Sequence, residues 1–222
     1  MRTISAVFLC LLITCPMLPA QEKSALETDP QGWINLLPDK SFKNWTRINL
    51  APSTQLAEAS PWQIEPDSGI LVCNGDKSGH EMLRYDRELT NFIVHLEWSF
   101  TKLDTENPRY NSGFYVRNND DASLWHQAQM GGASGGFLFG NTLVNGQKQR
   151  VNLRDEVKVN RVGPAGEWNT FEIRAEGKKI SLWVNGAVTT VFGACEIPSG
   201  YLGFEAEGYK ISFRNVRLKE LR

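Results

Sequence analysis

The sequence predicts an all-β fold, a two-sheet antiparallel sandwich. Apolar and polar residues alternate along several short segments, an Asn-Gly pair separates two of these segments, and turn-forming residues punctuate the whole chain. Alternation with a period of two is typical of strands that bury one face. The 19 glycines and 10 prolines fit many short strands joined by turns. No long amphipathic helix, internal repeat or low-complexity tract competes with this interpretation.

The clearest strand is predicted over residues 92–100. Its apolar positions are Phe92, Val94, Leu96, Trp98 and Phe100, and more polar residues separate them. This spacing places the apolar side chains on one face of the strand, where they can line a core.

A hairpin is predicted further along the chain. Segment 168–175 leads into 179–184, and Asn185-Gly186 then separates the latter from 187–192. Both central residues of a type I′ turn need positive φ, which Asn and Gly adopt most readily. The sequence therefore predicts that the last two segments pair as antiparallel strands.

The final strand is predicted over residues 210–221, with an irregularity inside it. Its apolar residues alternate up to Phe213 and then change phase, resuming at Val216. An extra residue inserted into one strand of a pair has this effect. We therefore expect a β-bulge near Arg214-Asn215.

The start of the chain has the composition of a secretory signal peptide, residues 1–20. Arg2 is its only charge, and an apolar run too short for a comfortable membrane span of about 20 residues leads to Ala20, which suits cleavage. We expect export to the periplasm or the cell exterior, a short polar linker over 21–30 and a single β-sandwich domain over 31–222. A lipid anchor on Cys15 is not expected, because Thr14 stands where lipoprotein signals usually have Gly or Ala.

Charge and motifs exclude several classes of function. The formal net charge is −1, so nothing attracts nucleic acid or an anionic membrane surface, and no second apolar run could span a membrane. Serine-hydrolase, zinc-protease and nucleotide-binding motifs are missing from the sequence. Cys73 and Cys195 remain after the leader, either as one disulfide or as two buried thiols. The sequence points to no particular cofactor, and a divalent metal is left open.

Strand parity predicts a polar and aromatic sheet face. Three predicted strands each combine an apolar face with a face of aromatic, amide, carboxylate or guanidinium groups. The residues expected there are Asn111, Tyr115, Arg117, Trp125, Gln127, Gln129, Tyr201, Glu205 and Glu207, with Trp183 able to join them. Aromatic rings stack on sugars, while amides, carboxylates and Arg bind hydroxyls, so a saccharide groove is one interpretation. An ordinary solvated sheet face is the alternative.

Two carboxylates and the histidines are the candidates for chemistry. Glu205 and Glu207 lie two residues apart, so their carboxyls are expected roughly 6–7 Å apart on one face. Such a pair could supply an acid and a base, bind a cation such as calcium, or be surface charge. His126 falls on the apolar face, which favours a hydrogen-bonded core histidine. His80 and His95 are expected at the surface or the rim.

Several segments, taken in order, resemble one family. They are Gly32-Trp33-Ile34-Asn35-Leu36-Leu37 with Asn44-Trp45, then Asn111–Arg117, Glu167-Trp168-Asn169, Tyr201–Gly208 and Phe213-Arg214-Asn215-Val216. In these segments the chain is similar to the 3-keto-disaccharide hydrolases, whose members are also described as 3-keto-glucoside 1,2-lyases and 3-keto-2-hydroxyglucal hydratases. The resemblance implies a concanavalin A-like, laminin-G-like jelly roll that bacteria export. It also implies a base that removes the C2 proton of a 3-keto-glycoside, followed by elimination or net hydrolysis.

The chain departs from the family pattern at two positions. The family commonly has Glu-x-Gln where this chain has Gln127-Ala128-Gln129, and Gln where this chain has Glu205. Carried over by position, the resemblance implies a groove that contains Asn111, Arg117, Gln127, Gln129, Glu205 and Glu207.

The resemblance also implies catalytic roles. Glu207 or Glu205 would be the base, and Arg117 with Gln129 would stabilise the enolate. His126 is the reserve candidate. Two other functions stay open, a carbohydrate-binding (lectin-like) domain without turnover and an adhesion module of the same fold.

Overall fold

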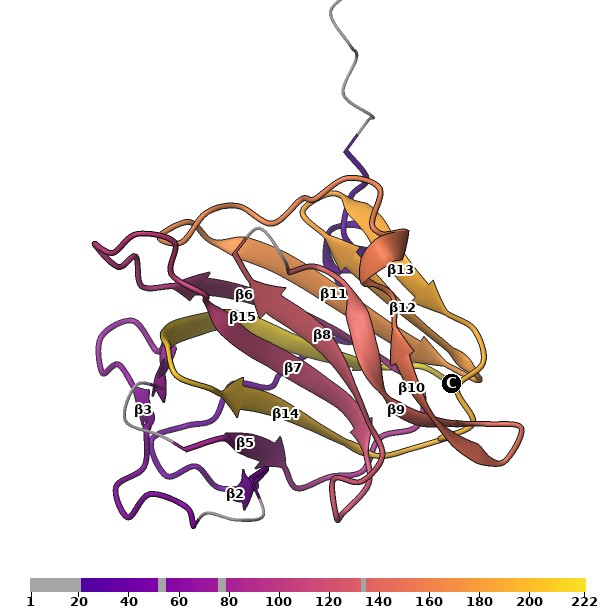
Figure 1. Ribbon diagram of the computed structural model, residues 1–222, viewed down its shortest axis with the longest axis horizontal. Helices are drawn as coiled ribbons and strands as arrows, with labels where there is room; N and C mark the ends of the chain where they lie inside the picture. The colour runs from indigo at the N-terminus through magenta and orange to yellow at the C-terminus, as the bar shows by residue number, and fades with distance from the viewer. Residues whose placement is uncertain (1–20, 52–54, 76–78, 133–134) are drawn as a thin grey trace, which may run out of the picture.

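The computed structural model describes residues 21–51, 55–75, 79–132 and 135–222. Within these ranges the chain forms two antiparallel sheets packed face to face, and Figure 1 looks through both layers. The prediction of an all-β, two-sheet antiparallel sandwich is confirmed. The predicted signal peptide, residues 1–20, lies outside the described residues, so cleavage and export stay predictions.

Sheet A is the sheet that carries the predicted hairpin and the last strand. Its strands lie in the order β13-β12-β11-β6-β15-β4-β3, and β1 also pairs with β15. Their bounds are β1 Ile34–Asn35, β3 Trp62–Ile64, β4 Leu71–Asn74, β6 Phe92–Phe100, β11 Asn169–Glu176, β12 Lys179–Val184, β13 Ala187–Phe192 and β15 Lys210–Glu220.

Sheet B carries the strands with the predicted polar face. Its order is β10-β9-β8-β7-β14-β5-β2. The bounds are β2 Trp45–Asn49, β5 Glu81–Tyr85, β7 Asn111–Asn118, β8 Trp125–Gly131, β9 Leu138–Val144, β10 Gln147–Asn152 and β14 Tyr201–Ala206. Strand β14 enters between β7 and β5, so a late segment of the chain lies in the middle of a sheet built from earlier ones (Figure 1).

The core lies between the two sheets. Phe204 of sheet B and Phe213 of sheet A meet with ring centroids 4.7 Å apart, and Phe114 lies 5.0 Å from Phe204. All three side chains are fully buried. Burying each such ring contributes about 1.5–3 kcal/mol to the free energy of unfolding, so the sandwich is stabilised mainly by contacts between the sheets.

The local features predicted in sheet A are confirmed. Asn185 and Gly186 have φ of 42° and 102° and join β12 to β13, where Val184 pairs with Ala187. The register of β15 against β6 shifts between residues 214 and 217, as expected for a bulge. The sequence left open whether Cys73 and Cys195 form a disulfide, and in the structure they are separate buried thiols.

The N-terminal segment, predicted as a short polar linker over residues 21–30, packs against sheet A. Residues Ala25–Thr28 form a short helix, α1, which begins with a capping box between Ser24 and Glu27. The backbone N–H groups of Ala25 and Leu26 donate to the Glu172 carboxylate on sheet A, at 2.5 and 3.0 Å. The segment therefore covers part of the outer face of this sheet. No helix among the described residues is long and apolar enough to cross a membrane.

Candidate functional site

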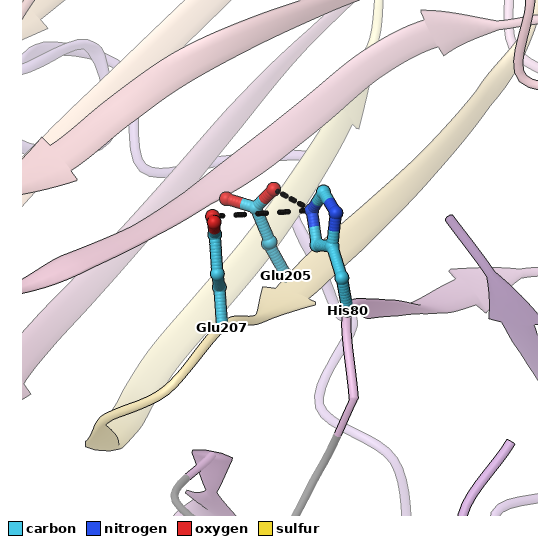
Figure 2. A group of neighbouring side chains, drawn as sticks. All are labelled: His80, Glu205 and Glu207. Carbon is cyan, nitrogen blue, oxygen red and sulfur yellow. Dashed lines mark hydrogen bonds and ion pairs between the residues drawn. The ribbon is translucent and has the colours of Figure 1, made fainter. Parts of the chain in front are cut away.

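Three ionisable side chains meet on the outer face of sheet B. His80 precedes β5, Glu205 is in β14 and Glu207 follows β14 (Figure 2). The Nε2 atom of His80 lies 2.7 Å from Oε1 of Glu205 and 3.9 Å from Oε2 of Glu207. We call these residues the carboxylate–histidine cluster.

The pairing of β5 with β14 creates this cluster. These strands run antiparallel, with Glu205 opposite Met82 and Ala206 opposite Glu81. Continuing the same register by one residue sets Glu207 opposite His80. Two segments about 125 residues apart in the chain thus supply one site.

Glu205 is the buried member of the cluster, and both of its oxygens are engaged. Oε1 accepts from the Tyr115 hydroxyl at 2.5 Å and faces His80, while Oε2 accepts from the Gln127 amide. Burial and the nearby Glu205 charge raise the pKa of Tyr115 well above its usual value, so this hydroxyl keeps its proton and donates. A buried carboxylate needs such donors, and together they fix its orientation.

A glycine makes room for one of these donors. A Cβ added at Gly113 would lie 1.7 Å from the side-chain nitrogen of Gln127. Because Gly113 has no side chain, the Gln127 amide can cross β7 to reach Glu205 in β14.

Glu207 is the exposed member, with 40% of its side chain accessible. Partial burial and the charge of Glu205 raise the pKa of its carboxyl, and His80 opposes that rise. Asn111 donates to Glu207 Oε2 at 2.5 Å, and Gln129 in turn donates to the Asn111 oxygen at 2.7 Å. Gln129 therefore positions the Asn111 amide, while Glu207 keeps access to solvent.

His80 has the opposite electrostatic tendency. Its hydrogen bond with Glu205 and the charges of both carboxylates raise the pKa of its imidazole, although partial burial opposes this. The cluster therefore combines an imidazole whose protonated form is favoured with a carboxylate whose proton affinity is increased. Such a combination suits transfer of a proton next to a group that develops negative charge.

A cleft of about 340 Å³ adjoins the cluster, within the usual size range of small-molecule sites. It is lined by Asn49, Leu50, His80, Tyr115, Asn118, Asp121, Ala122, Ser123 and Trp125. The rings of Tyr115 and Trp125 pack edge to face, 5.6 Å apart. The cleft thus offers an aromatic wall beside a polar, ionisable one.

Residues 32–219 match the family described as the 3-keto-alpha-glucoside-1,2-lyase-like domain. The match covers nearly all of the described chain. The chain belongs to this family. The resemblance found in the sequence is thereby confirmed, and the domain is of a carbohydrate-active type.

Solved structures with this fold are similar to the lyase-like domain at low sequence identity. A putative glycosyl hydrolase from Parabacteroides distasonis is 19% identical, with 91% of this chain and 100% of that chain covered and a TM-score of 0.59. The carbohydrate-binding module CBM66 from Bacillus subtilis is 14% identical, with coverage of 80% and 96% and a TM-score of 0.57. At these identities the likeness shows the fold alone. No curated protein is similar enough in sequence to count as a relative.

Most of the predicted groove residues of this lyase-like domain do come together. The residues joined by contacts on the outer face of sheet B are Asn111, Tyr115, Trp125, Gln127, Gln129, Glu205 and Glu207. His80 was expected only at the surface or the rim, and its place in the site was missed. His80 reaches the site only because β5 pairs with β14, and the sequence pattern carries no signal for that pairing.

Arg117 is not in the groove, contrary to the prediction. Its side chain is fully buried, and the guanidinium donates to the backbone oxygens of Gly177 (2.6 Å), Thr90 (2.8 Å) and Ile197 (3.1 Å). Arg117 has a φ of 51°, and the β7–β14 register shifts near this point. This irregularity breaks the strict alternation from which an outward side chain was predicted. Arg117 therefore fastens loops around the core and cannot stabilise an enolate at the cluster.

His126 is a core histidine, as the strand parity favoured, so its reserve catalytic role is wrong. Its Nε2 lies 2.8 Å from the Thr142 hydroxyl and 3.4 Å from Cys195 Sγ, and its ring stacks on Phe192. Burial lowers the pKa of its imidazole to about 4, so the ring is neutral at physiological pH.

Trp183 lies in the other sheet, so its predicted role in the groove is also wrong. It lines a separate cleft of about 460 Å³ together with His95 and Asn215. His95 was expected at the surface or the rim, yet it is only 4% exposed and its Nδ1 lies 2.9 Å from Glu172. The N-terminal segment that packs on Glu172 accounts for this burial.

Proposed function

We propose that the domain cleaves 3-keto-glycosides by elimination across C1 and C2. Glu207 acts as the base at C2, and His80 stabilises the negative charge on the C3 oxygen. The observation that carries this proposal is the carboxylate–histidine cluster beside the cleft, in which a half-exposed carboxylate with a raised pKa lies 3.9 Å from a histidine with a raised pKa.

The chemistry requires one base and one stabiliser of negative charge. A ketone at C3 acidifies the C2–H bond, so the Glu207 carboxylate can take that proton. The electron pair of the C–H bond moves into an enolate on C2, C3 and the C3 oxygen. The enolate then re-forms the ketone, a C1–C2 double bond forms, and the C1–O bond breaks. The leaving oxygen takes a proton from water, and water that adds across the double bond gives net hydrolysis.

Glu207 suits the role of base better than Glu205 does. Both Glu205 oxygens already accept hydrogen bonds, and the residue is only 2% exposed. A proton taken up by Glu205 would disrupt its contacts with Tyr115 or Gln127. Glu207 is open to the solvent, and its raised pKa brings its proton affinity closer to that needed for catalysis near neutral pH.

His80 takes the role that the sequence had suggested for Arg117. Glu205 holds Nε2 of the imidazole at 2.7 Å, and Figure 2 shows the other ring nitrogen pointing away from both carboxylates. In the protonated ring this Nδ1–H is available to donate to the C3 oxygen as charge develops there. His80 also lines the cleft.

The departures from the family pattern compensate each other. The resemblance expects Glu at 127 and Gln at 205, whereas this chain has Gln127 and Glu205, and the two side chains are hydrogen-bonded to each other. The carboxylate and the amide have exchanged strands, so the site keeps one of each. The missing family Glu at position 127 therefore does not argue against catalysis.

In a variant of this proposal, the carboxylate–histidine cluster binds a divalent cation. Ligand atoms of His80, Glu205 and Glu207 lie within 4.8 Å of one another. A cation bound by all three would replace the His80–Glu205 hydrogen bond and could take over the stabilisation of the C3 oxygen. Turnover that a chelator abolishes, and that one divalent metal restores, would favour this variant.

The second candidate function is saccharide binding without turnover. It rests on the cleft and its aromatic wall, Tyr115 and Trp125, which could hold a sugar without any reaction. Aglycone release from a panel of 3-keto-glucosides, with and without a chelator, separates the two functions. Release that is lost in Glu207→Gln and kept in Glu176→Gln, which removes an exposed carboxylate from sheet A, would support the enzyme. Saturable binding without release would favour the binding module. The absence of both binding and release would favour an adhesion module.

A further inference from the structure

A row of aromatic rings extends from the cleft across the outer face of sheet B. Beyond Tyr115 and Trp125, the ring of Phe139 lies 5.1 Å from that of Trp125 at 90°, and Phe137 follows at 5.8 Å. The row therefore leads away from the carboxylate–histidine cluster and toward β9 and β10.

Two guanidinium groups lie on this row. Arg150 of β10 lies 4.7 Å from the ring centroid of Trp125 and 4.9 Å from that of Phe139, and Arg154 lies 5.1 Å from that of Phe137. Both arginines are exposed. We call Arg150, Arg154 and the rings of Trp125, Phe137 and Phe139 the arginine–aromatic patch.

The charges of these two arginines are not neutralised within the described part of the chain. Neither Arg150 nor Arg154 forms an ion pair there. Other arginines do pair with carboxylates, namely Arg47, Arg84, Arg87, Arg174 and Arg214. A guanidinium held against a ring keeps its N–H donors at the edge of its plane, where an oxyanion can bind two of them at once.

The patch lies at a useful distance from the cluster. Strand β8, which carries Trp125, is two strands from β14, which carries Glu205. The Tyr115 hydroxyl contacts Glu205 at 2.5 Å and its ring lies 5.6 Å from that of Trp125, so one aromatic side chain separates the Glu205 carboxylate from the Trp125 ring, enough for one sugar ring and its glycosidic oxygen. Arg150 is also close enough to Tyr115, which lies between them, for its charge to oppose the rise in the pKa of that hydroxyl.

We propose that the arginine–aromatic patch binds an oxyanion on the leaving group of the substrate. This inference rests on the proposed function and specifies its substrate class, glycosides whose released part carries a carboxylate, sulfate or phosphate. The ring of the leaving group packs on Trp125, and its anion binds Arg150. Glu205 and Glu207 repel that anion at the other end of the site, so the charges orient the glycoside with its keto sugar at the cluster.

Matched aglycones test the proposal. We would compare 3-keto-glucosides that carry 4-carboxyphenyl, 4-sulfophenyl or neutral 4-carbamoylphenyl groups, using the wild type, Arg150→Gln and Arg150→Lys. Arg174→Gln, which removes an exposed charge from sheet A, is the control. We expect the wild type to favour the anionic aglycones by about tenfold in kcat/KM, the size typical of a charge-assisted hydrogen bond. Arg150→Gln should lose this preference, Arg150→Lys should keep part of it, and high salt should reduce it.

Equal kcat/KM for anionic and neutral aglycones in the wild type would overturn the proposal. So would equal losses in Arg150→Gln and Arg174→Gln. Binding of the corresponding unoxidised glucosides, followed by tryptophan fluorescence, needs no turnover. If their affinity depends on Arg150 while no keto-glucoside is cleaved, the subsite stands and the proposed function fails. If keto-glucosides are cleaved without any preference for anionic aglycones, the proposed function stands and the anion-binding subsite fails.

Discussion

The Nε2 atom of His80 lies 2.7 Å from Oε1 of Glu205, and this contact joins the segment before β5 to the centre of sheet B. Glu205 is buried and fully hydrogen-bonded, so it holds the imidazole in one orientation beside Glu207. In the proposed mechanism Glu205 is a positioning residue, whereas His80, which lines the cleft, and the half-exposed Glu207 would contact the substrate.

The rate should depend on pH through both of these groups. The proposal requires ionised Glu207 and protonated His80, and the pKa of each group is raised. We therefore expect a bell-shaped profile of kcat/KM, with its acidic limb above the usual 4.5 of a Glu and its alkaline limb above the usual 6.5 of a His. Profiles between about pH 4 and 9 test this. In His80→Gln the alkaline limb should vanish, and an unchanged limb would assign it to another group.

The Gln127–Glu205 pair should tolerate exchange better than single substitution. Gln127→Glu places a second carboxylate against buried Glu205, and we expect a loss of about 2–4 kcal/mol in the free energy of unfolding. The double variant Gln127→Glu, Glu205→Gln restores one carboxylate and one amide, so it should regain most of this loss. Urea unfolding of the three proteins measures the coupling. Additive losses in the double variant would show that the two side chains do not act as a pair.

Arg117 should matter for stability and not for the chemical step. Arg117→Met removes the donors to backbone oxygens of Gly177, Thr90 and Ile197, and leaving such groups unpaired costs about 1–3 kcal/mol for each one that water cannot reach. We expect a clear drop in the urea midpoint, with the kcat of the remaining folded protein within about twofold of the wild type. Arg174→Met controls for loss of an exposed arginine. Normal stability with a large loss of kcat would return Arg117 to the active site.

His126 should make the fold sensitive to mild acid. Its pKa is about 4 in the folded protein and near 6.5 when unfolded, so the unfolded state binds more protons between these values. The contribution is complete above pH 6.5 and is lost as the pH falls toward 4, by about 3 kcal/mol in total. Urea unfolding of His126→Gln at both ends of this window should show a smaller difference than the wild type. Parallel pH dependences would contradict the assignment.

The fold was predictable because its signals are local. The alternation in 92–100 and the Asn185-Gly186 turn depend on neighbouring residues, and the structure keeps both. Parity also placed Tyr115 and Gln127 on the same face as Glu205. The structure confirms this, because both side chains form hydrogen bonds with Glu205.

Three features of the site depend on non-local structure that the sequence pattern does not encode. Arg117 follows a change in the β7–β14 register, which reverses the side-chain direction that alternation predicts. Parity assigns Trp183 to an outer face but does not say of which sheet. The role of His80 arises only when β5 pairs with β14, more than a hundred residues later in the chain.

The most direct test of the central claim, that Glu207 removes the C2 proton, is exchange at C2. A 3-keto-glucoside incubated in deuterated water should gain deuterium at C2 with the wild type, and aglycone release from C2-deuterated substrate should be slowed. Glu207→Gln should reduce both the exchange and the release by about 10²–10⁴-fold, the usual contribution of a general base, while Glu176→Gln leaves them unchanged. Exchange that persists in Glu207→Gln and disappears in Glu205→Gln, with both variants folded, would contradict the account.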